Sequence, residues 1–99
     1  MSASVSLIIP HKHSYEQLNI LCEKIPLWNQ YPDEILIIDS SKIQIILNKN
    51  FTKFCNENNI VLKIINANNL YPGQARNKGV LLAINPVIAF LDVNTIPTN

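Results

Sequence analysis

The chain alternates short, largely apolar runs with segments whose apolar residues recur at helical spacing, and this alternation restricts its fold more than any other feature. Four such runs are predicted to be strands: Val5–Ile9, Ile35–Ile38, Ile60–Ile65 and Val87–Leu91. Strands without regular polar alternation are buried on both faces, and the helices between them supply the cover. The order of elements therefore predicts an α/β fold with a parallel sheet and right-handed crossovers.

Three segments between the strands are predicted to be helices. The first begins at Ser14, where Gln17 three residues later completes a capping-box pattern, and it ends at Pro26. The second begins with the same pattern at Ser41 and Gln44. Its apolar stripe consists of Ile43, Ile46, Leu47, Phe51, Phe54 and Cys55. The third helix is predicted to begin at Gly73 and to end before Asn85-Pro86.

Length and composition favour a single domain over residues 1–99, since the chain is 47% hydrophobic and 15% charged. The net charge of +1 provides no basic field for a nucleic acid. Cys22 and Cys55 are expected to be buried free thiols in a reducing cytosol. No secretory signal is evident, and the longest apolar run, 79–91, is too short to cross a membrane. We therefore expect a cytoplasmic protein without a transmembrane segment or a nucleic-acid partner.

Two aspartates directly follow predicted strands, at the end of the sheet where ligands bind in parallel α/β folds. Asp39 on its own is equally well explained as a turn residue or a helix N-cap. Asp92 is followed at the second position by Asn94, which places two oxygen-bearing side chains on one side of the chain. This spacing suits a hard divalent cation, Mg²⁺ or Mn²⁺, whose other ligands are water and phosphate oxygens.

The segment 73–79 forms the first turns of the third predicted helix, where free backbone N–H groups favour an anion. Arg76 and Lys78 add cationic groups suited to a diphosphate, although a solvated basic helix start is the simpler explanation when the segment is taken alone. The pair His11 and His13 lacks an evident third metal ligand and is expected to line a pocket or face solvent.

Several common site types are excluded by what the sequence lacks. With only two glycines, the chain contains neither a G-x-G-x-x-G fingerprint nor a phosphate-binding P-loop. A dinucleotide dehydrogenase and a Walker-type nucleotidase are therefore disfavoured. No nucleophile elbow supports a serine hydrolase.

Four segments, in order, resemble the N-terminal part of family 2 glycosyltransferases, which have the GT-A fold. Residues 5–10 are similar to the opening strand of the family, and residues 29–40 to its "NQ-x-YP-x-EIIVVD" stretch. Residues 73–79 match its "G-x-A-x-N-x-G" helix start, and residues 90–97 resemble its DxD segment. The resemblance covers nearly the whole chain, but only the first part of a typical catalytic domain of the family.

The resemblance implies a Rossmann-like three-layer α/β/α arrangement with strand order 3-2-1-4, whereas a flavodoxin-like signalling domain would have the order 2-1-3-4. It implies a nucleotide-diphospho-sugar donor, a UDP-sugar first of all, and a Mg²⁺ or Mn²⁺ cofactor. The implied donor-binding residues are Pro10 and His11 beside the nucleoside, Asp39 on the base, Arg76 on the base or diphosphate, and Asp92. Asp92 and Asn94 would face the ribose and the metal-bridged diphosphate.

Three positions depart from the family pattern. Ser40 replaces the second residue of an Asp-Asp pair, Asn94 replaces the second Asp of DxD, and Lys12 replaces an aromatic residue. The acceptor site and general base of the family come after the DxD segment. We therefore expect the donor-binding part of an inverting glycosyltransferase, with weak or no turnover on its own.

The alternative is a non-catalytic α/β domain used for protein contacts. The sheet edge beyond the last strand would expose apolar surface, so homo-oligomers through an exposed sheet edge are expected.

Overall fold

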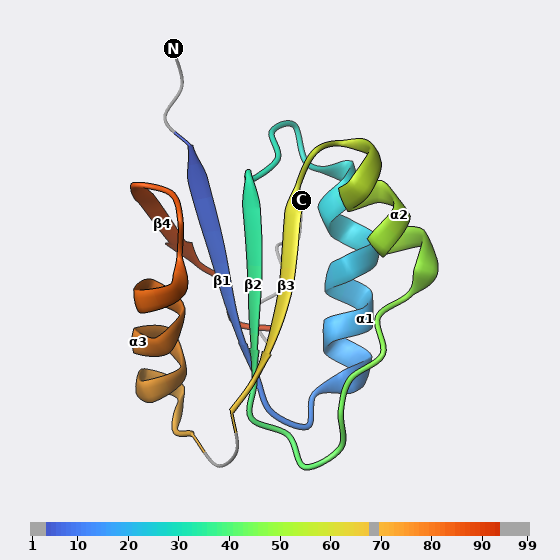
Figure 1. The fold of residues 1–99 in the computed structure, drawn as a ribbon. Coiled ribbons are helices and arrows are strands. Elements are labelled where there is room, and N and C mark those ends of the chain that lie inside the picture. Colours follow the sequence, from blue (N-terminus) through green and yellow to red (C-terminus); the bar gives the residue numbers. More distant parts are fainter. Residues whose placement is uncertain (1–3, 68–69, 94–99) are drawn as a thin grey trace.

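The computed structural model describes residues 4–67 and 70–93, which form the predicted alternation of strands and helices (Figure 1). The elements are β1 (Val5–His11), α1 (Tyr15–Lys24), a short 3-10 helix η1 (Ile25–Leu27), β2 (Glu34–Asp39), α2 (Lys49–Glu57), β3 (Val61–Asn66), α3 (Pro72–Leu82) and β4 (Val87–Phe90). Each predicted strand is present, with boundaries that differ from the prediction by one or two residues.

The four strands form one parallel sheet in the order β3-β2-β1-β4. Helices α1 and α2 cover one face and α3 covers the other, which gives three layers (Figure 1). The expected Rossmann-like architecture and strand order are thus confirmed, and the signalling-type order 2-1-3-4 is excluded. No helix in the described part of the chain is long and apolar enough to cross a membrane.

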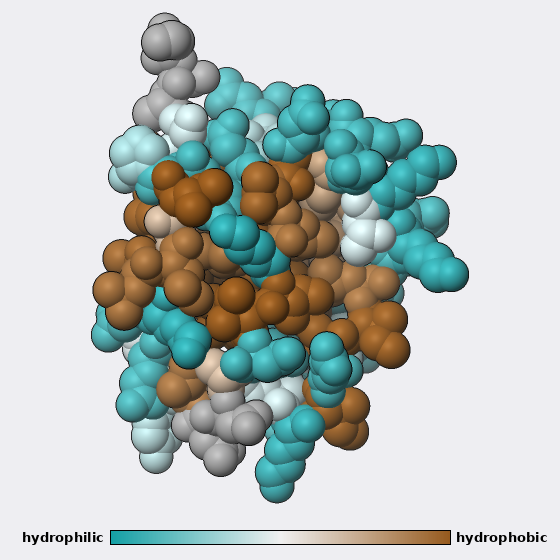
Figure 2. Space-filling view, viewed as in Figure 1, coloured by the Kyte–Doolittle hydropathy of each residue, from teal (hydrophilic) through white to brown (hydrophobic). Residues whose placement is uncertain are grey.

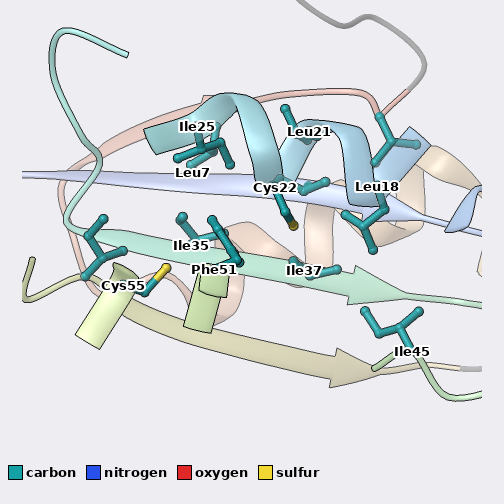
Figure 3. Close-up of a cluster of buried hydrophobic side chains, with 13 residues drawn as sticks. Leu7, Leu18, Leu21, Cys22, Ile25, Ile35, Ile37, Ile45, Phe51 and Cys55 are labelled. Carbon is teal, nitrogen blue, oxygen red and sulfur yellow. The ribbon is translucent and has the colours of Figure 1, made fainter. Parts of the chain in front are cut away.

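The larger of the two core clusters lies on the α1/α2 face of the sheet (Figure 3). Helix α1 contributes Leu18, Leu21 and Cys22, and α2 contributes Phe51 and Cys55. They pack against buried side chains of β1 and β2, namely Leu7, Ile9, Ile35 and Ile37. Both cysteines are free thiols, as expected. Burial raises the pKa of Cys22 to about 12, with smaller contributions from Cys55 and Glu23, and it also raises the pKa of Cys55. Both thiols are therefore unreactive parts of the core.

The predicted start of the second helix is wrong. Residues 42–48 are not helical, and α2 begins at Lys49, where the Asn48 side chain accepts a hydrogen bond from the Asn50 N–H at 2.7 Å. Ile43 and Ile46, expected on the buried stripe, are 71% and 95% exposed. A helix beginning at Ser41 would be stabilised mainly by burial of its apolar stripe. Because Ile43 and Ile46 are not buried, this stabilisation is absent and the segment is not helical.

The predicted capping box at the first helix is also wrong. Ser14 occupies the N-cap position of α1, yet its side chain makes no capping bond. Its hydroxyl instead donates to the Lys12 carbonyl, while its N–H donates to His11 Nε2 at 3.1 Å. The histidine ring thus accepts from the N-cap N–H, the donor that the side chain of Gln17 would satisfy in a capping box.

Helix α3 begins one residue earlier than predicted, at Pro72, a residue type favoured at the first helical position. It then packs closely on β1 through Gly79, where an added Cβ would lie 2.5 Å from Ile8 Cγ2. That approach is too close for any side chain, so Gly79 sets the distance between this helix and the sheet.

Replacing Gly79 with alanine should therefore lower the free energy of unfolding by about 1–3 kcal/mol, since α3 or Ile8 must move. Gly73→Ala is the matched control, because nothing lies within 4 Å of the Cβ it would add. Urea denaturation followed by circular dichroism measures both variants. A Gly79→Ala protein as stable as the wild type would show that this close packing is not required.

A buried carboxylate ties the elements together at the amino end of the sheet. Glu34, at the start of β2, is fully buried. Its Oε1 accepts from Ser6 Oγ at 2.7 Å and from the Ile84 N–H at 3.1 Å, and its Oε2 lies 3.1 Å from Lys63 Nζ. Burial raises the pKa of Glu34, but the Ser6, Ile84 and Lys63 interactions outweigh this and lower it overall. One side chain therefore joins β1, β2, β3 and the end of α3.

Candidate functional site

A cleft lies at the carboxyl ends of the strands, where parallel α/β proteins bind ligands. Its volume is about 140 Å³, and it is lined by Pro10, His11, Lys12, Ser14, Ser40, Leu70, Ala75, Arg76, Asp92 and Val93. Four of the predicted site residues, Pro10, His11, Arg76 and Asp92, are thus brought together from β1, α3 and the segment after β4. Asn94, the second predicted metal ligand, lies outside the described residues.

Pro10 explains why the cleft opens between β1 and β4. The β1–β2 ladder continues to the pair His11 and Asp39, whereas the β1–β4 ladder ends at Ile8 and Phe90. The hydrogen bonds that β4 donates to Ser4 and Ile8 show that even-numbered residues of β1 face β4. Pro10 is the next even-numbered residue and has no N–H to donate, so it cannot extend this ladder.

His11 and Asp39 form a fully buried pair at the floor of the cleft. His11 Nδ1 lies 3.0 Å from Asp39 Oδ1, while its Nε2 accepts from the Ser14 N–H. A ring nitrogen that accepts carries no proton, so Nδ1 carries it and donates to the carboxylate. Both ring nitrogens are therefore engaged within the protein. The described residues contain no group of three His, Cys, Asp or Glu side chains that could hold a metal ion.

Asp39 lies beneath the cleft and is not among its lining residues. Its Oδ1 accepts from His11 and, at 3.1 Å, from the Ser41 N–H, whereas Oδ2 is buried without a hydrogen-bond partner in the described structure. Burial raises the pKa of Asp39, but hydrogen bonds from His11 and Ser41 outweigh it, so the pKa lies below its usual value. In this conformation the Asp39 carboxylate holds His11 and the Ser41 N–H in place beneath the cleft.

Ser40 and Ser41 were not singled out as individual site residues, although they follow Asp39 at the end of β2. Ser40 lines the cleft, and Ser41 Oγ accepts from the His13 N–H at 2.8 Å. Tyr15 adds a second link, because its hydroxyl donates to the Ile43 carbonyl at 3.0 Å. These hydrogen bonds therefore link the segments that follow β1 and β2. Their position directly after a strand is the sequence signal for both serines, and Ser40 also stands at the second position of the family's Asp-Asp pair.

The cleft carries charges of both signs. Lys12 is exposed at its rim, Arg76 is half-buried in the second turn of α3, and Asp92 is exposed after β4. Asp92 is the only carboxylate among the lining residues. A single carboxylate beside cationic side chains fits a divalent cation whose remaining ligands are diphosphate oxygens and water.

Three larger hollows, of about 200, 340 and 470 Å³, lie away from the carboxyl ends of the strands. Among the described residues that line them, Glu23 is the only charged side chain. None of them lies at the end of the sheet where parallel α/β proteins bind ligands, so the smaller cleft remains the candidate.

A parallel sheet of order 3-2-1-4, with a polar cleft where β1 and β4 part, defines a Rossmann-like α/β domain. Residues 6–98 match the family model described as glycosyl transferase family 2, and the chain belongs to that family. No curated protein matches the sequence.

Among solved structures, the chain is similar to the S. aureus protein TarS, with a TM-score of 0.67 and 22% sequence identity. The match covers 92% of this chain and 16% of the TarS chain, so it extends over a small part of that larger protein. At this identity the likeness shows a shared fold.

Proposed function

We propose that this chain binds a nucleotide-diphospho-sugar as the donor-binding part of an inverting glycosyltransferase, with a UDP-sugar as the first donor to test. The observation that carries the proposal is the cleft itself, because it gathers Arg76, Asp92 and the end of β1 at the switch point of a family 2 sheet. The volume of about 140 Å³ is below the roughly 300 Å³ of pockets for whole drug-sized ligands. We infer that it holds part of the donor, and that the rest lies over the exposed rim.

In this proposal Pro10 and His11 border the nucleoside, and Arg76 contacts the diphosphate from the first half of α3. Because Arg76 is half-buried, its interaction with a phosphate is stronger than it would be in bulk water. Asp39 acts first through His11, whose orientation it fixes, and would reach the base only if its carboxylate turned towards the cleft.

Asp92 is the residue that would hold Mg²⁺ or Mn²⁺, with Asn94 as the proposed second ligand. When bound, such a cation neutralises charge on the departing nucleoside diphosphate. The remaining task is deprotonation of the acceptor hydroxyl, which needs a base within hydrogen-bond reach. Both nitrogens of His11 are already engaged, and we assign no base among the described residues.

Calorimetric titration with UDP-sugars in the presence of Mn²⁺ tests this proposal. Asp92→Ala and Arg76→Ala should each weaken binding at least about tenfold, since each removes a charged contact to the ligand. Lys78→Ala is the matched control, because Lys78 is a half-buried cation of α3 that does not line the cleft. Unchanged heats for both Asp92→Ala and Arg76→Ala would exclude the cleft as the donor site.

A further inference from the structure

Strand β3 is an open edge of the sheet, with β2 as its only neighbour among the described strands. The Val61 and Ala67 N–H groups donate to the Asp33 and Asp39 carbonyls of the β2 side. In a parallel ladder, alternate residues bond to the same neighbour, so the odd-numbered residues of β3 face β2. Leu62, Ile64 and Asn66 therefore direct their backbone N–H and C=O groups to the open side.

The β3 edge has few of the features, such as proline or free charges, that prevent the edges of two sheets from pairing. β3 has six residues, contains no proline, and carries one charged residue, Lys63. Lysine on an edge strand normally repels an incoming strand, but Lys63 is held 3.1 Å from the buried carboxylate of Glu34. The charge that would guard the edge is thus neutralised by the fold.

The surface beside this edge is apolar. Figure 2 shows hydrophobic residues gathered across the side of the molecule where Figure 1 draws β3. A groove of about 470 Å³ runs along the strand, and its lining carries no charge: Leu47, Thr52, Cys55, Asn56, Ile60, Leu62 and Ile64. A strand added at this edge would place every second side chain over the groove.

We propose that the β3 edge pairs with the β3 edge of a second copy of this chain, antiparallel about a two-fold axis at Ile64. This register exchanges hydrogen bonds between the two Ile64 residues and sets Leu62 opposite the partner's Asn66. The net charge of +1 offers little repulsion between copies.

The opposite edge is a poorer candidate for the same pairing. β4 has four residues, and the N–H groups of Val87 and of Leu91, the residue after the strand, donate to the β1 side. Only Ile88 and Phe90 then face outward within the strand. A second copy would gain fewer backbone hydrogen bonds there, so Phe90 provides a matched control position.

Disulfide trapping tests this pairing without demanding a tight dimer. Opposed residues of a hydrogen-bonded antiparallel pair have Cα atoms about 5.5 Å apart, within the range that a disulfide spans. Ile64→Cys should form a covalent dimer under mild oxidation, visible on a non-reducing gel. Phe90→Cys and the wild type, whose two cysteines are buried, should remain monomeric. Efficient trapping at Phe90 and none at Ile64 would overturn the proposal.

Sedimentation equilibrium provides the second measurement. The wild type should show a dimer fraction that rises with protein concentration, whereas Ile64→Lys and Ile64→Glu should each sediment as monomers. Mixing the two variants should restore dimers, because opposite charges then meet across the axis. Circular dichroism verifies that both variants are folded. A wild type that stays monomeric at high micromolar concentration, together with no trapping at Ile64→Cys, would refute the pairing.

Discussion

Replacing Glu34 with alanine should lower the free energy of unfolding by about 3 kcal/mol, one of the two largest effects expected for a single substitution. The change leaves Ser6 Oγ and the Ile84 N–H without their shared acceptor and removes the partner of Lys63. Unpaired buried donors and broken buried ion pairs are each costly. Urea denaturation measures the loss.

Glu23→Ala is the matched control, since Glu23 is exposed on α1 and should change stability little. Glu34→Gln should fall between the two, because it keeps an oxygen acceptor but loses the charge. A Glu34→Ala protein within 0.5 kcal/mol of the wild type, roughly the range of surface substitutions, would show that the amino-end network contributes little.

Replacing Asp39 with alanine should cost about 2–3 kcal/mol, the second of the two largest effects. His11 Nδ1 and the Ser41 N–H would both lose their acceptor in a buried position. Because His11 lines the cleft, affinity for the proposed nucleotide-sugar donor should fall as well, even though the carboxylate is not among the lining residues. Denaturation and calorimetry measure the two effects separately.

The pH dependence of stability provides a second test of Asp39. Its pKa is lowered in the folded state, so its charged form stabilises the fold above the unfolded pKa of about 4. That stabilisation is lost as the pH falls below about 4 and through the folded pKa. The Asp39→Asn variant should therefore lose less stability than the wild type over this interval. Identical acid profiles for the two proteins would contradict the assigned direction.

Much of the fold could be predicted from the sequence because buried parallel strands appear in it as apolar runs. Strand order came from resemblance to a family and is confirmed by the sheet. The start of α2 was wrong because apolar spacing alone does not distinguish a buried stripe from a loop that exposes Ile43 and Ile46. The spacing of apolar residues shows that a helix would have an apolar face, but the helix is stable only where that face packs against another part of the protein.

The sequence predicted which end of the sheet holds the site, but it did not predict which side chains of the site contact one another. Position after a strand identified Asp39 and Asp92, and a helix start identified Arg76. The pairing of His11 with Asp39 depends on the register of β1 against β2, which local sequence does not specify. The sequence could therefore nominate Asp39 for ligand contact but could not show that its carboxylate is turned inward.

One register relation recurs along β1 and β2. Ser6 pairs with Glu34 at one end and His11 with Asp39 at the other, and each pair is separated by 28 positions. A slip of one residue between these strands would break both polar pairs together. The two polar pairs therefore fix the alignment of β1 with β2 at both ends of the strands. The positions of the residues at the floor of the cleft depend on that alignment.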